Sequence, residues 1–500
     1  VIQKANVGFA KYIASLPEGK ERGVAIGYDN RHMSYKFAIE SAKVLATYGI
    51  KSYIFESLRP TPELSFAVRY LKCAGGIMIT ASHNPKEHNG YKVYDDTGCQ
   101  LLPEAADQVV QYVNEVEDEL NIKVFSDEEA YPYMTWIGEE VDEAYYKEVM
   151  AIEVNPGMDK SDFKIVFSPQ HGTSNVAVRT CLTRLGYDLV PVLAQCAPDP
   201  DFSNTKSPNP EVPASYELAI KKAKEVDADV VVITDPDGDR LGVVAKHNGE
   251  YVLMSGNQSA AVYLEYILSQ MKEKGTLPDN AVMYNTIVTS DLGELVARSY
   301  GVDVEKTLTG FKFIGDKIRK YEQTHEKTFV FGYEESYGCV IKDFVRDKDA
   351  VQAVLTAAEA GNFYKKQGKD LVDVLNELYA KHGTFKETQI ALSKAGAAGA
   401  ARIKEIMDNL RKDAPQEIGG VKVVKVEDYG NSTCSDGTTI QLPKSNVLKY
   451  YLEDGSWIAA RPSGTEPKCK FYFSIKGSDA DDAASKTEVF HKAMMEIIGE

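Results

Sequence analysis

Short apolar runs alternate with amphipathic stretches through most of the chain. GVAIGYD (23–29) precedes the helical pattern KFAIESAKVLATYG (36–49), and TPELSFAVRYLKC (61–73) precedes the apolar run GGIMITAS (75–82). The same order recurs twice further along, so strands and helices alternate in three related modules. Strands and helices at this spacing predict sheets with parallel strands, covered by helices on both faces.

The pattern changes near Ser393. A long amphipathic helix, AARIKEIMDNLRKD (400–413), is followed by the strand-like runs KVVKVEDYG (422–430) and WIAARPSG (457–464). Because helix and strands are segregated here, the tail predicts a smaller α+β domain. The expected fold is therefore α/β, with three related α/β domains of mixed or parallel sheets and a C-terminal α+β domain. The predicted domains are 1–150, 151–255, 256–385 and 386–500.

Composition narrows the classes of function. The 500 residues are 43% hydrophobic and 26% charged, with a net charge of −17, as in an ordinary globular protein. Such acidity disfavours a nucleic-acid or anionic-membrane partner, either of which needs a basic surface. No apolar stretch approaches the length of a membrane span, and no secretory signal opens the chain. The seven scattered cysteines include no C-x-x-C pair, so reduced thiols in the cytoplasm are expected.

The segment TASHNP (80–85) places Ser82 directly after a buried strand, where ligands gather in α/β folds. His83, Lys86 and Lys92 surround this hydroxyl in sequence with a proton acceptor and two cations. A serine that caps the next helix is the plainer alternative. No G-x-S-x-G motif surrounds Ser82, so a hydrolase nucleophile is not indicated.

The segment DPDGDR (235–240) is the most specific local signal. Asp235, Asp237 and Asp239 alternate after an apolar run, and three carboxylates this close repel each other unless a hard cation lies between them. The spacing excludes an EF-hand, whose sixth loop position is glycine, whereas Arg240 stands there. Mg²⁺ fits a loop with few protein ligands. A solvated acidic turn is the alternative.

Two further loops suit a sugar phosphate. GYEES (332–336) offers Glu334 and Ser336 to hydroxyl groups, although alone it would also suit a solvated turn. RPSGTEPK (461–468) has the composition of a phosphate cradle, with a guanidinium, hydroxyls, a lysine and flexible backbone donors. In isolation, an ordinary turn is the alternative. A serine, a Mg²⁺ loop and a separate phosphate cradle together describe a mutase, which phosphorylates one hydroxyl and takes a phosphoryl group back from another.

The sequence closely resembles the α-D-phosphohexomutases, the phosphoglucomutase/phosphomannomutase family, over nearly its whole length. TASHNP, DPDGDR, GYEES and RPSGTEP occur in the family order, and GYDNR, PQHGTS, LSGNQ, TLTGFKFIG and VRDKDAV resemble the longer phosphoglucomutase-2-like branch. The resemblance implies four domains around a central cleft. It also implies a phosphoglucomutase, an isomerase that interconverts glucose 1-phosphate and glucose 6-phosphate through glucose 1,6-bisphosphate.

The resemblance also assigns roles to residues. Ser82 is the implied phosphoserine and binds Mg²⁺ together with the three aspartates, while His83 and Lys92 assist proton transfer, Lys92 being the favoured acid/base. The remaining implied residues are a catalytic Arg31 in GYDNR and the substrate-binding Arg240, Lys312, Glu334, Ser336, Arg461, Ser463, Gly464 and Thr465.

Some alternatives stay open at this point. Relatives carry a glycine-rich N-terminal segment with an arginine near the serine, and none precedes VIQKANVG, so the N-terminal part is expected to be missing. A phosphomannomutase, a phosphopentomutase or a non-catalytic sugar-phosphate sensor would share these motifs. A phosphatase would instead use an aspartate nucleophile. The expected partners are small sugar phosphates, and the expected state is a cytoplasmic monomer or homodimer.

Overall fold

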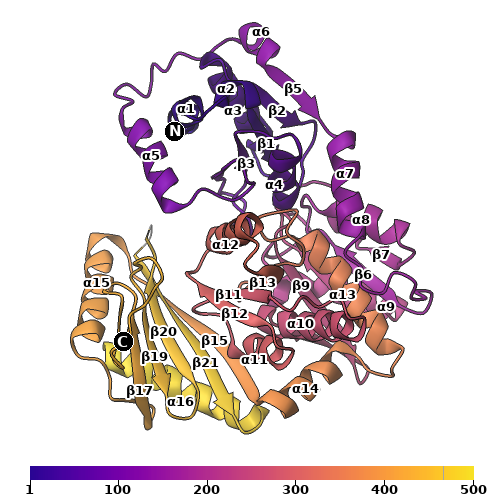
Figure 1. Ribbon diagram of the computed structural model, residues 1–500, viewed down its shortest axis with the longest axis vertical. Coiled ribbons are helices and arrows are strands. Elements are labelled where there is room, and N and C mark those ends of the chain that lie inside the picture. Colours follow the sequence, from indigo (N-terminus) through magenta and orange to yellow (C-terminus); the bar gives the residue numbers. More distant parts are fainter. Residues whose placement is uncertain (465–466) are drawn as a thin grey trace. The chain divides into compact units, whose positions relative to one another are not determined.

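The computed structural model describes residues 1–464 and 467–500. The chain forms two compact units. The first consists of residues 1–285, 300–305 and 310–374, and the second of residues 286–299, 306–309 and 375–500. Figure 1 labels their helices and strands along the chain.

The first sheet has five strands in the order β4-β3-β1-β2-β5. All neighbours are parallel except β3 and β4, which are antiparallel. Its strands are β1 (Val24–Tyr28), β2 (Ser52–Phe55), β3 (Gly75–Ile79), β4 (Tyr91–Tyr94) and β5 (Met134–Ile137). The accompanying helices are α1 (Ile2–Ser15), α2 (Gly19–Arg22), α3 (Ser34–Thr47), α4 (Thr61–Tyr70), α5 (Pro103–Asn114), α6 (Asp127–Ala130) and α7 (Glu139–Met150).

Alternation along β1 and β3 decides which helix packs on which face. Ile26 and Ile77 belong to a core cluster with apolar residues of α1 and α3. Gly76, the residue before Ile77, points to the other face of the sheet, toward α4, because a Cβ there would lie 2.7 Å from Val68 Cγ2. The small residue therefore lets α4 approach the sheet closely, which fixes where its N-terminus lies.

The second sheet has the order β10-β9-β8-β6-β7. Parallel pairing joins β6 to β7 and β8, and antiparallel pairing joins β8, β9 and β10. Its strands are β6 (Lys164–Ser168), β7 (Asp188–Pro191), β8 (Val230–Thr234), β9 (Leu241–His247) and β10 (Glu250–Met254), with helices α8 (Asn175–Arg184) and α9 (Glu217–Val226). All five residues of β8 are buried, as its unbroken apolar run predicts.

The third sheet has the order β12-β11-β13-β14. Its strands are β11 (Ala281–Thr286), β12 (Asp303–Thr307), β13 (Thr328–Glu334) and β14 (Gly338–Val340). The helices of this region are α10 (Gly256–Glu273), α11 (Asp291–Ser299), α12 (Phe311–Thr324), α13 (Ala350–Lys365) and α14 (Leu371–His382).

The C-terminal sheet has seven strands, ordered β15-β21-β20-β19-β17-β16 with β18 paired to β17. Every recorded pairing in it is antiparallel. Its elements are β15 (Thr384–Ser393), α15 (Gly396–Lys412), β16 (Glu417–Ile418), β17 (Val421–Asp428), β18 (Thr433–Cys434), β19 (Leu448–Leu452), β20 (Trp457–Pro462), β21 (Lys468–Gly477) and α16 (Ala480–Ile498). Apolar residues of α15 and α16 form one core with the strands. The predicted fold class, including the α+β tail, is confirmed.

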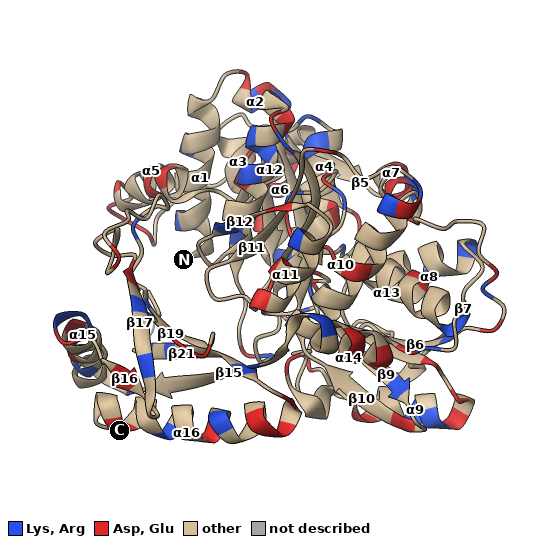
Figure 2. Cartoon of the chain, turned by 60° about the horizontal axis from the view of Figure 1, so that its bottom comes forward, with Lys and Arg blue, Asp and Glu red and all other residues tan. Residues whose placement is uncertain are grey.

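Charged side chains of both signs are interspersed along α9 and α16 (Figure 2). On α16, for example, Lys486 lies 3.4 Å from Asp482 and Lys492 lies 3.8 Å from Glu496. In the described part of the chain, every helix is too short or too polar to cross a membrane.

Candidate active site

The Ser82 loop leaves β3 in a strained conformation. Ser82 has φ +53°, in the left-handed region that residues other than glycine rarely adopt. Its N–H donates to Thr80 Oγ1 at 2.8 Å, and its half-buried hydroxyl lies 3.2 Å from His83 Nδ1. Strain of this kind persists only where the surroundings enforce it.

Arg31 supplies much of that enforcement. Its fully buried guanidinium pairs with Asp29 at 3.1 Å. It also donates to the carbonyl oxygens of Ser82 and Asn84, both at 2.6 Å, and of Pro85 and His88, at 2.8 and 3.1 Å. These contacts hold the loop's backbone. The structure therefore places Arg31, which the resemblance implied to be catalytic, directly against the Ser82 loop.

The aspartate loop follows β8. Asp235, Asp237 and Asp239 are buried, and one carboxylate oxygen from each lies within 4.8 Å of the others. Asp235 Oδ2 accepts the Ser82 hydroxyl at 3.0 Å, and its Oδ1 accepts the N–H groups of Asp239 and Arg240. The sequence-predicted serine and acidic loop therefore meet directly, although 153 positions separate Ser82 from Asp235.

A cation fits this loop. Asp237 Oδ1 and Asp239 Oδ1 are buried and have no hydrogen-bond donor among the described residues. Burial and the charges of the other two aspartates raise the pKa of Asp235. A buried carboxylate cluster with unpaired oxygens costs free energy unless a hard cation neutralises it. The donor set is all oxygen, as Mg²⁺ prefers.

Lysines border the loop. Lys92 Nζ donates to Asp237 Oδ2 at 2.9 Å. Burial opposes protonation of Lys92, but the charges of Asp237 and Asp239 outweigh it and raise its pKa. Burial likewise opposes ionisation of Asp237, but Lys92 outweighs it and lowers the pKa of that carboxyl.

Lys348 was not among the predicted site residues, yet its Nζ lies 3.2 Å from Asp239 Oδ2. Its segment, VRDKDAV, contributes to the family resemblance, and nothing in the local pattern singles out the lysine. Arg240, which was predicted, donates to Glu211 at 2.7 Å and lies 3.9 Å from Asp239.

The GYEES segment forms the turn between β13 and β14. Glu334 is buried, and its Oε1 accepts the N–H of Gly310, the residue before α12. The turn is tied to the aspartate loop, because Leu241 N–H donates to the carbonyl of Tyr337 at 2.9 Å. Ser336 lies half-buried in this turn. Lys312 lies in the first turn of α12, and burial lowers the pKa of its ammonium group.

The predicted phosphate cradle belongs to the second compact unit. Arg461 lies near the end of β20, followed by Ser463 and Gly464. Thr465 lies outside the described residues. Arg461 stands directly opposite Lys470 in the antiparallel β20–β21 pair. This register places two cations opposite each other in neighbouring strands, as the binding of a phosphate requires. Lys470 was missed because only strand register reveals it.

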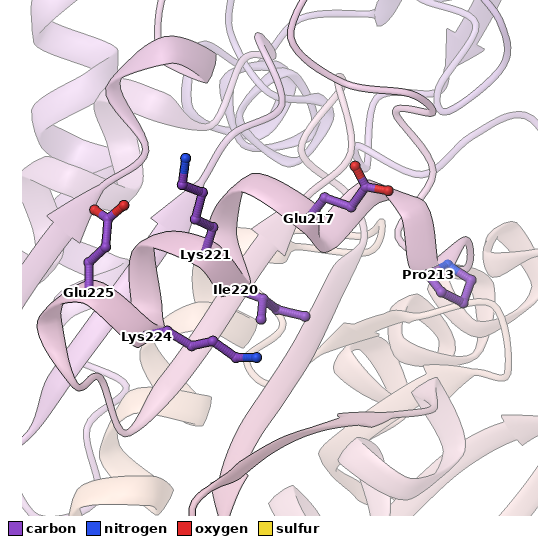
Figure 3. A pocket seen from close by; sticks show the side chains of 6 residues that line it. All are labelled: Pro213, Glu217, Ile220, Lys221, Lys224 and Glu225. Carbon is purple, nitrogen blue, oxygen red and sulfur yellow. The ribbon is translucent and has the colours of Figure 1, made fainter.

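Two other features involve different residues. His247, Asp370 and Asp373 also form a group that could hold a metal, but Asp370 and Asp373 hydrogen-bond N–H groups at the start of α14. A pocket of about 640 Å³ on α9 is lined by Pro213, Glu217, Ile220, Lys221, Lys224 and Glu225 (Figure 3). None of those six is a predicted site residue.

Four models of one family match the chain. Residues 1–120, 143–249 and 255–382 match phosphoglucomutase/phosphomannomutase alpha/beta/alpha domains I, II and III, and residues 400–492 match the C-terminal domain of that family. A phosphoglucomutase of Staphylococcus epidermidis is 39% identical over 493 residues, which cover 97% of this chain and 88% of the relative.

Solved structures share the fold. A putative phosphomannomutase from Thermus thermophilus has a TM-score of 0.73 at 21% identity, covering 100% of this chain and 94% of that one. An Aspergillus fumigatus N-acetylphosphoglucosamine mutase, solved in complex with glucose 1,6-bisphosphate, has a TM-score of 0.52 at 14% identity, covering 100% and 98%.

These matches confirm the predicted family and fold, and the curated relatives confirm the expected isomerase-class phosphoglucomutase function. The chain belongs to the phosphoglucomutase/phosphomannomutase family.

Proposed function

We propose that this chain interconverts glucose 1-phosphate and glucose 6-phosphate by way of a phosphorylated Ser82 and glucose 1,6-bisphosphate. The observation that carries the proposal is the hydrogen bond from Ser82 Oγ to Asp235 Oδ2, at 3.0 Å. It brings a hydroxyl that could carry a phosphoryl group directly to a buried loop of three carboxylates. A loop serine that merely capped a helix would need no such partner.

The proposed protein ligands of Mg²⁺ are Asp235, Asp237 and Asp239, together with an oxygen on Ser82. Bound there, Mg²⁺ would neutralise charge on the transferred phosphoryl group. Asp237 Oδ1 and Asp239 Oδ1 support this assignment, since both are buried without a donor in the described structure.

In the proposed reaction, the bond between phosphorus and Ser82 Oγ breaks as a bond forms between phosphorus and a sugar hydroxyl. The hydroxyl's proton passes to a protein group, and Ser82 Oγ recovers a proton. His83 Nδ1, 3.2 Å from Ser82 Oγ, and Lys92 are the proposed groups for this transfer. The reverse step at the other end of the bisphosphate restores the phosphoserine and releases the isomer.

Other residues would bind the sugar and its second phosphate. Glu334 and Ser336 are proposed to contact sugar hydroxyls. Arg240, Lys312, Arg461, Ser463, Gly464 and Thr465 are proposed substrate-binding residues, and Lys470 joins them as a further cation of the phosphate cradle. The cross-strand register of Arg461 and Lys470 supports the cradle, because it places two cations opposite each other.

We place the domains at 1–150, 151–255, 256–385 and 386–500, with the serine, the metal ligands, the sugar-recognition turn and the phosphate cradle in that order. We propose a cytoplasmic monomer or homodimer whose partners are small sugar phosphates.

The test is phosphorylation of Ser82. Wild type and Ser82→Ala are incubated with labelled glucose 1,6-bisphosphate, and the labelled peptide is mapped by mass spectrometry. We expect the label on Ser82 and a loss of nearly all mutase turnover in Ser82→Ala without a change in melting temperature. Label on an aspartate would indicate a phosphatase-like mechanism and would refute the proposal. A panel of hexose and pentose 1-phosphates checks the choice of glucose.

A further inference from the structure

A threonine outside the predicted site contacts one of the proposed metal ligands. Thr61 begins α4, and its side chain is fully buried. Its hydroxyl donates to Asp237 Oδ2 at 3.0 Å, across 176 positions of sequence. Its N–H donates to the carbonyl oxygen of the same aspartate at 2.8 Å.

The backbone of the aspartate loop is held from three sides. The carbonyl oxygens of Pro236, Asp237 and Gly238 each accept one N–H, from Thr173, Thr61 and Ala350 respectively, at 2.8, 2.8 and 3.1 Å. Gly238 adopts φ +69°, and a Cβ there would lie 2.8 Å from Pro60 Cβ. The loop's path is therefore fixed by several independent bonds, and any single side-chain hydroxyl is dispensable for it.

The side chain of Asp237 is fixed differently. Its Oδ2 accepts two hydrogen bonds, from Thr61 Oγ1 and Lys92 Nζ, while its Oδ1 is buried without a donor among the described residues. Lysine ends in a freely rotating ammonium on a long stem, whereas threonine has a short, β-branched side chain. Thr61 is therefore the stiffer of the two contacts.

We propose that Thr61 is a positioning residue for Asp237: its hydroxyl holds Oδ2 and leaves Oδ1 to the cation. This inference rests on the proposed function, because it takes Asp237 to be a metal ligand. A hydrogen-bonding partner of a metal ligand orients it, and loss of such a partner typically weakens metal binding about 10- to 100-fold. Thr61 thereby makes the metal site depend on the N-terminus of α4.

Thr61→Val isolates this contact. Valine keeps the shape of threonine and its N–H bond to Asp237, and replaces the hydroxyl by a methyl group that cannot donate. Mn²⁺, which binds carboxylate sites and can be followed by electron paramagnetic resonance, is the probe. We expect Thr61→Val to bind Mn²⁺ about 10- to 100-fold more weakly than wild type. Thr61→Ser, which keeps the hydroxyl, should stay within about threefold of wild type, well short of that loss.

A matched control lies one turn along α4. Ser65 is also buried, and its hydroxyl donates to the carbonyl of Gly98 at 2.6 Å and accepts the N–H of Arg346 at 3.0 Å, rather than bonding an aspartate side chain. Ser65→Ala should therefore lower the melting temperature in EDTA but leave the affinity for Mn²⁺ unchanged. In mutase assays of Thr61→Val, the Mg²⁺ concentration for half-maximal rate should rise, while the rate at saturating Mg²⁺ stays close to that of wild type.

The outcomes separate this inference from the proposed function. Thr61→Val that binds Mn²⁺ as tightly as wild type would overturn the positioning role and leave the metal site standing. Thr61→Ser that binds as weakly as Thr61→Val would also overturn it, because the hydroxyl would not be the cause. Wild type that binds no Mn²⁺, or Asp237→Asn that binds it normally, would overturn the metal site and this inference together. Thr61→Ala provides a second hydroxyl-free variant if valine prevents folding.

Discussion

Replacing Asp235 by asparagine should stabilise the metal-free protein. Asp235 is fully buried, and burial together with the charges of Asp237 and Asp239 raises its pKa. An acid whose charged form is disfavoured by folding costs stability at neutral pH, and asparagine removes that charge. Its amide oxygen can still accept the N–H groups of Asp239 and Arg240, which bond Oδ1 of Asp235.

The carboxylate separations give the magnitude. Oxygens of the three aspartates lie within 4.8 Å of one another. Two unit charges at that distance repel by about 3.5 kcal/mol at an effective dielectric constant of about 20. Asp235 takes part in two such pairs, but Lys92, Lys348 and Arg240 offset much of the repulsion. We therefore expect a net gain of about 1–3 kcal/mol, which raises the melting temperature by several degrees.

Asp237→Asn is the matched contrast, and the structure predicts the opposite sign. Lys92 donates to Asp237 at 2.9 Å and lowers its pKa despite burial, so this carboxylate stabilises the fold as an anion. A hydrogen bond to a charged group contributes about 1.5–3 kcal/mol, and much of that should be lost. The sequence pattern alone does not distinguish the three aspartates from one another.

The assay is thermal unfolding of the three proteins in EDTA and again in excess Mg²⁺. A ligand at about 100 times its Kd stabilises the fold by about 2.7 kcal/mol, so Mg²⁺ should raise the melting temperature of wild type and have little effect on either variant. Asp235→Asn that melts below wild type in EDTA would refute the repulsion argument. Asp237→Asn that melts above wild type in EDTA would refute the assignment of Lys92 to Asp237.

Three further predictions concern the sugar turn, the phosphate cradle and a buried lysine. With deoxy sugar phosphates the wild-type Glu334 carboxylate lacks its hydroxyl partner, so wild type should react with them poorly and Glu334→Ala should show a smaller rate penalty. Glu334→Gln, which keeps an acceptor for the Gly310 N–H, is the control. An undiminished penalty in Glu334→Ala contradicts the role. Arg461→Ala should lower the affinity for glucose 1-phosphate and for glucose 6-phosphate alike, each by about 10- to 150-fold, with phosphoserine occupancy unchanged. Lys470→Ala should lower both affinities by a smaller factor. An effect on one monophosphate only contradicts a shared cradle. Lys449 is buried, and burial lowers its pKa from 10.5 to about 7. Between those values the unfolded chain binds more protons, so wild-type stability should rise with pH across that window. Lys449→Met should therefore be more stable than wild type by about 1–3 kcal/mol at pH 7, with the difference shrinking toward pH 10; a constant difference in unfolding experiments would contradict the shifted pKa.

Local pattern predicts the strands and helices that carry the site, but not every strand between them. The buried runs before Ser82 and Asp235 form β3 and β8 as their apolar residues indicate. The hairpin of β9 and β10 was missed, although Asn248 and Gly249 both have positive φ and form the turn that such a pair favours. The Asn-Gly pair at 248–249 is the sequence signal that would have predicted this hairpin.

The residues that the sequence could not reveal act through tertiary contacts. Thr61 looks like an ordinary first residue of a helix before proline, and only folding brings it to Asp237. Lys348 precedes the N-cap residue Asp349 of α13, and only its side chain reaches Asp239. A motif can be recognised in a sequence because its combination of residue types is unusual. A positioning residue such as Thr61 is of an ordinary type, and only the atom that it contacts in the folded protein reveals its role.

The contact between Ser82 and Asp235 also depends on which form of the serine is present. As a free hydroxyl, Ser82 donates a hydrogen bond to Asp235 Oδ2, so the contact is favourable without a cation. Phosphorylation replaces that proton with a group carrying roughly −1.5 to −2 charges, and the same contact becomes a repulsion between anions. A cation bound among the three carboxylates would reverse the sign again. If the proposed function holds, the phosphoserine needs the cation more than the free serine does, and by linkage the phosphorylated protein should bind that cation more tightly.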